Sequence, residues 1–192
     1  MGTSGQPVDR RIRSPTEAEM TAVAHPTRLR MLRLCHRQAL TNQELAVRLG
    51  IAPATALRHV RILANAGFIA AQPVRNGQRG ALERPYRSTG LSIRLAWDAA
   101  ESPELLQRMD IAMLHAVIAE LIEAGPGATR AEFRGTMRLR PEVWRELTSR
   151  MDALIAEFVS REDAVGEELS LTWIMHTVPR PASSALDFPG AG

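Results

Sequence analysis

The chain has 192 residues, 45% of them hydrophobic and 4% aromatic, and this length can bury one good-sized core or two small ones. No apolar run reaches the roughly 18 residues that a membrane span needs, and no apolar stretch follows the N-terminal arginines, so we expect neither a membrane protein nor a secretory signal. The single cysteine, Cys35, cannot form an internal disulfide and fits a reducing cytoplasm.

The charge is unevenly distributed. Residues 1–90 contain 14 arginines and five acidic residues, a net charge of +9, whereas residues 91–192 contain ten arginines and 16 acidic residues, a net charge of −6. All 24 basic residues are arginines, whose planar guanidinium suits phosphate and guanine recognition. A G/C-rich genome is the alternative explanation for the lack of lysine. The asymmetry between the halves indicates an anionic partner for the first half.

Two short helices are predicted after a polar arm at residues 1–13, which we expect to be disordered. Ser14 as N-cap and Pro15 in the first turn start the first helix, which runs to about Ala24. His25-Pro26 starts the second, which ends near Gln38.

The next two helices are joined by a very tight turn. Thr41 and Glu44 have the spacing of a capping box, and Gly50 ends the helix that they start. The following helix runs from Pro53 to about Asn65. Its predicted buried stripe consists of Ala56, Val60 and Leu63. Because only two residues separate these helices, they must cross steeply, as in a helix-turn-helix unit.

A basic hairpin follows. Residues 68–71 predict a strand, Asn76-Gly77 is a turn pair, and residues 82–88 predict the return strand. The hairpin carries Arg75, Arg79, Arg84 and Arg87. Helices, a tight turn, a further helix and a basic hairpin, in this order, are typical of the winged helix-turn-helix, whose second turn-unit helix enters the major groove.

The segments "AHPTRLRMLRLC" and "LTNQELAVRLGIAPATALRHVRILANAGFI" resemble ArsR-type winged-helix transcription regulators over residues 18–90. This resemblance implies DNA contacts from Pro53, Ala54, Thr55, Leu57, Arg58, His59, Arg75, Arg79, Arg84 and Arg87, with His59 in a supporting role near the backbone. We add Arg61, expected at a backbone phosphate, and Thr41 at the start of the preceding helix. Two positions depart from the family pattern. Ala52 replaces a capping Ser, and Leu57 replaces a Ser.

A long helix is predicted from Ser102-Pro103 to about Ala124, after a joining segment at residues 91–101 that we leave unassigned. It is apolar on more than one face, so it must be covered on more than one side, and a second copy of the chain is the expected cover. The predicted dimerisation residues are Leu105, Leu106, Met109, Met113, Ala116, Val117 and Leu121.

The C-terminal part alternates between strand and helix patterns. Apolar and polar residues alternate over 131–140 and over 169–178, which predicts two half-buried strands. Between them, Pro141 opens an amphipathic helix. Its predicted inner residues are Val143, Trp144, Leu147, Met151, Leu154, Ile155 and Phe158. Trp144, Trp173, Met137, Met151 and Met175 either line a pocket for a small apolar ligand or simply fill a core.

The predicted class is mainly α with a small β component (α+β). Its parts are a disordered arm (1–13), a winged helix-turn-helix (14–90), a linker with dimerisation helix (91–127), a strand–helix–strand unit for dimerisation or ligand sensing (128–178) and a flexible tail (179–192). We found no spacing of a nucleophile, paired carboxylates, phosphate loop or metal ligands. We therefore expect a cytoplasmic homodimeric DNA-binding regulator, a repressor, with no enzymatic activity, cofactor or metal. The alternatives are a ligand-responsive regulator and a protein-interaction module without DNA binding.

Overall fold

The computed structural model describes residues 13–77, 81–97, 100–163 and 165–178. The chain divides into two compact units, residues 1–128 and 129–192. No helix within the described ranges is both long and apolar enough to cross a membrane. The expected disordered arm, apart from Arg13, and the expected flexible tail at 179–192 lie outside the described residues.

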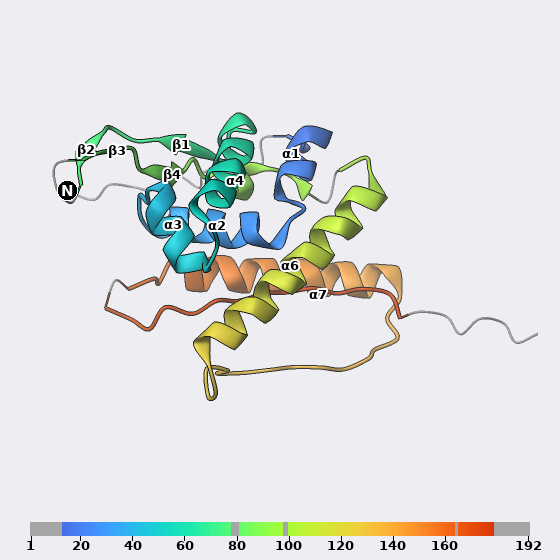
Figure 1. Cartoon of the computed structure of the whole chain (residues 1–192). Helices are drawn as coiled ribbons and strands as arrows, with labels where there is room; N and C mark the ends of the chain where they lie inside the picture. Colours follow the sequence, from blue (N-terminus) through green and yellow to red (C-terminus); the bar gives the residue numbers. More distant parts are fainter. Residues whose placement is uncertain (1–12, 78–80, 98–99, 164, 179–192) are drawn as a thin grey trace, which may run out of the picture. The chain divides into compact units, whose positions relative to one another are not determined.

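The first unit begins with four helices (Figure 1). They are α1 (Glu17–Val23), α2 (Pro26–Arg37), α3 (Asn42–Leu49) and α4 (Pro53–Asn65). The bounds confirm the predictions for α2, α3 and α4, but the prediction for the start of α1 is wrong. Thr16, not Ser14, is the N-cap, because Thr16 and Glu19 form a reciprocal capping box that satisfies two backbone N–H groups.

The tight turn between α3 and α4 is held at both ends. Gly50 adopts a left-handed conformation (φ 62°), which lets the Ile51 N–H donate to the Ala46 carbonyl at 3.0 Å. The Asn42 side-chain amide donates to the Pro53 carbonyl at 3.1 Å. These contacts fix the start of α4 against the start of α3, as the sequence predicted for a helix-turn-helix.

One hydrophobic core connects α1–α4 to the strands that follow. The predicted stripe of α4, Ala56, Val60 and Leu63, is fully buried, and so is Phe68. Cys35 is also buried, as expected for a core residue, and burial raises the pKa of its thiol to about 12.

The hairpin forms two short antiparallel ladders (Figure 1). β1 (Ile69–Ala71) pairs with β4 (Tyr86–Ser88), and Leu40 extends this sheet by exchanging two backbone hydrogen bonds with Tyr86. β2 (Arg75–Asn76) pairs with β3 (Leu82–Glu83). The predicted turn at Asn76-Gly77 is wrong, since Asn76 pairs with Leu82 inside the ladder. The return strand is interrupted at Pro85, which has no N–H to donate.

Two further helices complete the first unit: α5 (Leu91–Arg94) and α6 (Pro103–Ala124). α6 has the predicted bounds, and the Ser102 hydroxyl caps it by accepting from the Leu105 N–H. Ion pairs tie α6 to α2. Arg30 pairs with Glu123, and Arg33 Nε lies 2.8 Å from Glu120 Oε1.

The second unit contains one helix, α7 (Pro141–Val159), within its described residues. The helix was predicted, and so was the pair between Glu146 and Arg150, at 2.5 Å. Both predicted strands are wrong for the chain as described, because 131–140 and 169–178 are extended but pair with no other segment. The predicted inner face of α7 is also wrong, since none of its residues is buried.

Candidate nucleic-acid interface

The outer face of α4 is the centre of the candidate interface. Pro53, Ala54, Thr55, Arg58 and Arg61 are all exposed, while the opposite stripe is packed into the core. Successive side chains on a helix are rotated by about 100°. The exposed side chains therefore project from the surface of α4 that lies away from the buried stripe. Among the described residues, no ion pair occupies Arg58 or Arg61.

Three predicted DNA-contacting residues lie elsewhere. The Thr41 side chain is buried, where its hydroxyl caps α3 by accepting from the Glu44 N–H. His59 is only 8% exposed, and its ring lies 4.7 Å from that of His25. Leu57 is half-buried. None of these three side chains lies fully on the outer face of α4, and their predicted DNA contacts stay predictions.

The surroundings of His59 are positively charged. Burial lowers its pKa to about 4, and the nearby His25, Arg28 and Arg58 add to this effect. Burial, Arg28 and Arg58 also lower the pKa of His25, whose Nδ1 accepts from the Thr27 N–H as the cap of α2. Both rings are therefore neutral at pH 7.

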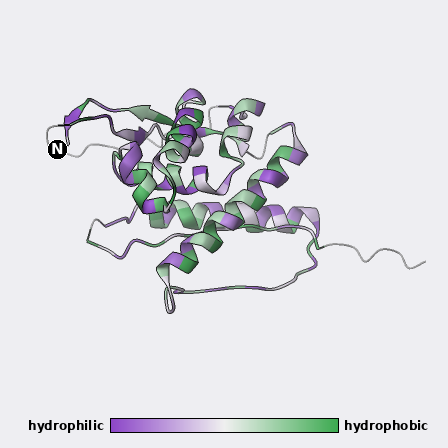
Figure 2. Cartoon of the chain, viewed as in Figure 1, coloured by the Kyte–Doolittle hydropathy of each residue, from purple (hydrophilic) through white to green (hydrophobic). Residues whose placement is uncertain are grey.

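The four hairpin arginines have different environments. Arg84 and Arg87 are exposed, and no ion pair holds them among the described residues. Arg79 lies outside the described residues. Figure 2 shows hydrophilic residues gathered at the outer end of the hairpin, around β2 and β3. The hairpin therefore presents a polar wing that adds positive charge beside the helix-turn-helix.

Arg75 is already engaged within the domain. Its guanidinium lies 2.6 Å from Glu44 on α3 and 3.5 Å from Glu83 on β3. Glu44 also accepts from the Thr41 N–H at 2.7 Å. Although burial opposes the shift, the Thr41 hydrogen bonds and Arg75 lower the pKa of Glu44. Arg75 thus fastens the base of the wing to α3, a role that sequence reasoning missed because the two residues are 31 positions apart.

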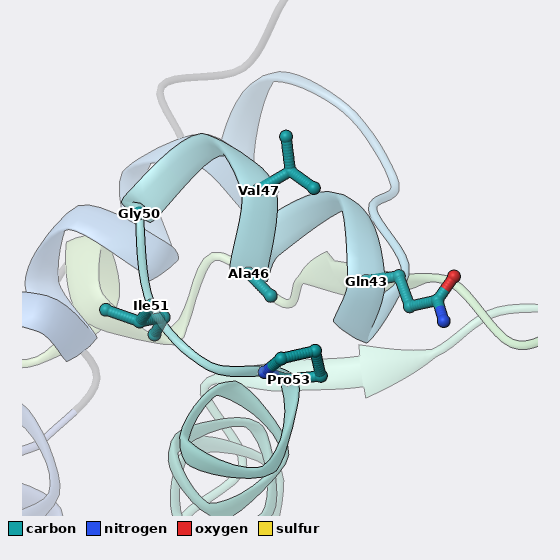
Figure 3. Close-up of a pocket in the computed structure, with 6 residues that line it drawn as sticks. All are labelled: Gln43, Ala46, Val47, Gly50, Ile51 and Pro53. Atoms are coloured by element: carbon teal, nitrogen blue, oxygen red, sulfur yellow. The ribbon is translucent and has the colours of Figure 1, made fainter.

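A shallow surface hollow lies beside the start of α4 (Figure 3). Ala46 and Pro53 approach each other between α3 and α4, whereas the Val47 and Gln43 side chains point outward. Val47 is 82% exposed, which is unusual for a valine within a helix. The residues that line the hollow are Gln43, Ala46, Val47, Gly50, Ile51 and Pro53. Sequence reasoning also missed this apolar spot next to the exposed end of α4.

The described residues contain no group of three or more His, Cys, Asp or Glu side chains that could hold a metal ion. The arrangement offers instead an exposed helix with free guanidinium groups, flanked by a basic wing. Such a surface can bind phosphates through charge and base edges through the major groove.

Residues 23–71 match the family model described as a helix-turn-helix domain. No curated protein matches the chain. Similar solved structures include reduced HlyU from Vibrio cholerae, with 19% identity, 52% of this chain and 84% of that chain covered, and a TM-score of 0.33. Another is the homodimeric winged helix-turn-helix DNA-binding domain Mb0332 from Mycobacterium bovis, a possible ArsR-family transcriptional regulator, with 19% identity, 60% and 85% coverage and a TM-score of 0.33.

The adhesin competence repressor AdcR from Streptococcus pyogenes is also similar, with 15% identity, 76% and 82% coverage and a TM-score of 0.28. The assignment depends on the matched residues 23–71 and on the geometry of α3, α4 and the wing. Residues 23–71 therefore form a helix-turn-helix domain, and the antiparallel hairpin that ends at Ser88 follows it as a wing.

Proposed function

We propose that this protein is a cytoplasmic homodimeric repressor that reads a near-palindromic operator through α4 and the wing. The observation that carries the proposal is the outer face of α4, where Thr55, Arg58 and Arg61 are exposed and the two arginines have no ion-pair partner among the described residues. In this scheme, Arg58 contacts a base edge or a nearby phosphate. Arg61, one turn further along, contacts backbone phosphate.

The wing supplies further phosphate contacts in this scheme. Arg84 and Arg87 are the exposed arginines that the structure describes there, and Arg79 belongs to the same hairpin by sequence. Arg75 has an indirect role, because its pairs with Glu44 and Glu83 orient the wing. The net charge of +9 over residues 1–90 supports an anionic partner for this surface.

Dimerisation is proposed along α6. Leu105 and Ala116, two of the predicted dimerisation residues, are buried within their own unit, whereas Leu121 is exposed. The exposed apolar row of α6 consists of Ile111, Leu114, Ile118, Leu121 and Ile122. Its spacing of three and four residues is that of a helix–helix seam. This row, which the prediction largely missed, is where we place the second copy.

A salt-dependent binding experiment tests the proposal. A labelled duplex selected from a random pool, and a scrambled duplex of the same length, are titrated with the full chain at several salt concentrations. We expect the selected duplex to bind at least about a thousandfold more tightly at physiological salt, and both affinities to fall steeply as salt rises. No binding to either duplex, combined with tight binding to another protein, would instead identify an interaction module.

An apolar ligand site in the second unit is the second candidate. Its support is that Met151, Ile155 and Trp173 are half-buried in a unit whose described residues are mostly exposed. A ligand that binds there is expected to change the fluorescence of Trp173. If the two sites are coupled, it also changes the affinity of the protein for the operator. Trp173→Phe is expected to remove the fluorescence change and to weaken the effect of the ligand on operator affinity.

A further inference from the structure

Residues 131–139 form an extended segment with two chemically distinct faces. Phe133, Met137 and Leu139 project on one face, and Glu132, Arg134 and Arg138 on the other, because side chains alternate along extended backbone. Phe133 is 79% exposed and Met137 is 55% exposed. Within the described part of the chain, the backbone of 131–139 forms no hydrogen bond with another backbone group. The segment thus has the pattern of a half-buried strand without a neighbour.

The rest of the second unit does not supply that neighbour. None of the described residues between 129 and 178 is buried, including those of α7. A unit that buries so little apolar surface does not offset the conformational entropy lost on ordering it. The partner that completes the segment must provide both a row of backbone hydrogen bonds and an apolar face.

We propose that residues 131–139 pair antiparallel with the same residues of a second copy, around a two-fold axis at Gly135. In this register, Glu132 lies opposite Arg138 of the partner subunit, and the reciprocal pair forms on the other side of the axis. On the other face, Phe133 lies opposite Met137 of the partner subunit, a favourable sulfur–aromatic contact. Opposite charges and aromatic pairs across strands stabilise a sheet.

The charge pattern favours this register over the two neighbouring axes and over parallel pairing. Moving the axis to residue 134 places Arg134 opposite its own copy, and moving it to residue 136 places Arg134 opposite Arg138 of the partner subunit. Parallel pairing in register places every charge opposite its own copy. Like charges directly opposite each other destabilise a sheet. The axis at Gly135 pairs the whole of 131–139 with itself and places no like charges opposite each other within this range.

The ends of the segment are compatible with this register. Arg130 and Arg140 meet across the axis, but each is paired with a carboxylate of its own chain. Arg130 binds Glu167 at 2.5 Å, and Arg140 lies 3.2 Å from Glu142. Their local neutralisation reduces the repulsion at the two ends.

Cysteine cross-linking in the full-length protein tests the pairing. In the proposed register, the two Gly135 Cα atoms lie about 4.5–5.5 Å apart, within disulfide range. A Cβ at Gly135 meets only the tip of the Phe133 ring, at 3.0 Å, which can rotate away. Gly135→Cys is therefore expected to form a covalent dimer under mild oxidation. Thr136→Cys is the matched control, since its two copies lie about 7–8 Å apart.

We expect Gly135→Cys to cross-link at least about tenfold faster than Thr136→Cys on a non-reducing gel. Cys35 does not interfere, because it is buried in both variants. Equal rates for the two variants, or no dimer from either, would overturn the register. In a second experiment, Glu132→Arg and Arg138→Glu each weaken the dimer about tenfold, and the double variant restores it.

This inference extends the homodimer proposed above, and sedimentation of the unmodified chain separates the two ideas. A dimer whose Gly135→Cys variant stays unlinked contradicts the pairing of 131–139 but keeps the homodimer. A monomer contradicts both. DNA binding by α4 is measured independently with the selected duplex. Neither the presence nor the loss of DNA binding decides whether residues 131–139 pair between copies.

Discussion

At the scale of single residues, Arg58 and His59 are neighbours with opposite roles. Arg58 projects from α4 into solvent, whereas His59 points into the domain against His25. The family resemblance placed both at the DNA, with His59 in a supporting role, because a resemblance assigns positions and not directions. One hundred degrees of helical rotation separates adjacent side chains, and that rotation decides which of the two is available to a partner.

Replacing Arg58 by Ala is expected to weaken binding to the selected duplex by about 1–3 kcal/mol if Arg58 contacts a base. Binding to the scrambled duplex is then nearly unchanged. The measurement is fluorescence anisotropy with both duplexes, and Arg150→Ala, which removes an equal charge from α7, is the control. An equal loss on both duplexes would identify Arg58 as a phosphate contact.

The buried His59 makes stability depend on pH. Its pKa is about 4 in the folded chain and about 6.5 when unfolded, so the unfolded state binds a proton first as the pH falls. Above pH 6.5 the ring is neutral in both the folded and the unfolded state, so its burial costs no protonation energy. Between pH 6.5 and pH 4, up to about 3 kcal/mol of the free energy of unfolding is lost. His25 contributes in the same direction.

Urea unfolding at pH 7.5, 6 and 5 measures this effect. His59→Gln is expected to flatten the slope over this range, since it cannot be protonated. Glu19 provides an internal reference, because the Arg13 hydrogen bond lowers its pKa to about 2. Its contribution is present above its unfolded pKa and lost only below about pH 4.5. A slope that is unchanged in His59→Gln would contradict the assignment.

At the scale of elements, the start of α4 is incompletely capped. Ala52 occupies the N-cap with extended backbone (φ −62°, ψ 141°), but it has no side chain to accept a hydrogen bond. The N-caps of α1 and α3, in contrast, both form capping boxes. The start of α4 is therefore held by Pro53, the Asn42 contact and the core, with no side-chain cap.

Ala52→Ser is expected to stabilise the first unit by about 1 kcal/mol, because the serine hydroxyl can accept a hydrogen bond from a backbone N–H in the first turn of α4. Thermal unfolding measures the gain. Ala66→Ser, at the other end of α4, is the matched control and is expected to have no such effect, since a C-cap offers carbonyls and not donors. A stabilisation of equal size in the control would exclude capping as the cause.

Elements defined by local contacts were predictable and those defined by distant contacts were not. The bounds of α2, α3, α4 and α6 follow from caps, prolines and glycines within a few residues, so the sequence alone places them. The start of α1 was misassigned because Ser14 and Thr16 are both good caps, and only Thr16 has Glu19 three residues later. Residues 131–139 have a strand pattern, but a strand also needs a neighbour, which a pattern cannot specify.

The residues of the candidate interface likewise separate into those set by local contacts, which were predictable, and those set by distant contacts, which were not. The buried stripe of α4 fixes by periodicity which side faces outward, so Thr55, Arg58 and Arg61 were predictable. The pair between Arg75 and Glu44 was not, because the return of the wing to α3 depends on the tertiary fold. The burial of His59 could have been predicted, since it lies three residues after Ala56 and four before Leu63 on the same helix face. Its ring contact with His25 could not, because it joins different helices.

At the scale of the whole molecule, α6 has two apolar rows. Leu105, Ala112 and Ala116 face the first unit, whereas Leu114, Ile118 and Ile122 are exposed. A helix that is apolar around much of its circumference has to be covered on more than one side. The exposed row is therefore the expected contact with a second copy. The buried row packs against the rest of the first unit and fixes the position of α6 there.

Ile118→Asp is expected to raise the dimer dissociation constant at least about a hundredfold, because a carboxylate would be buried in an apolar seam. Ile93→Asp on α5 is the matched control, since both isoleucines are 53% exposed. Sedimentation velocity measures the dimer, and circular dichroism checks that both variants fold. A dimer that survives Ile118→Asp would place the contact between copies elsewhere.

The ion pairs that fasten α6 to α2 limit how the two halves of a dimer can adapt to an operator. Arg30 and Arg33 hold one end of α6 to α2, and α2 shares its core with α4. If two copies join along α6, the gap between their recognition helices is set by rigid parts and not by a hinge. One extra base pair between half-sites turns one of them by about 35° around the duplex axis. Such a protein is expected to tolerate base-pair substitutions within a half-site far better than a change in the number of base pairs between half-sites.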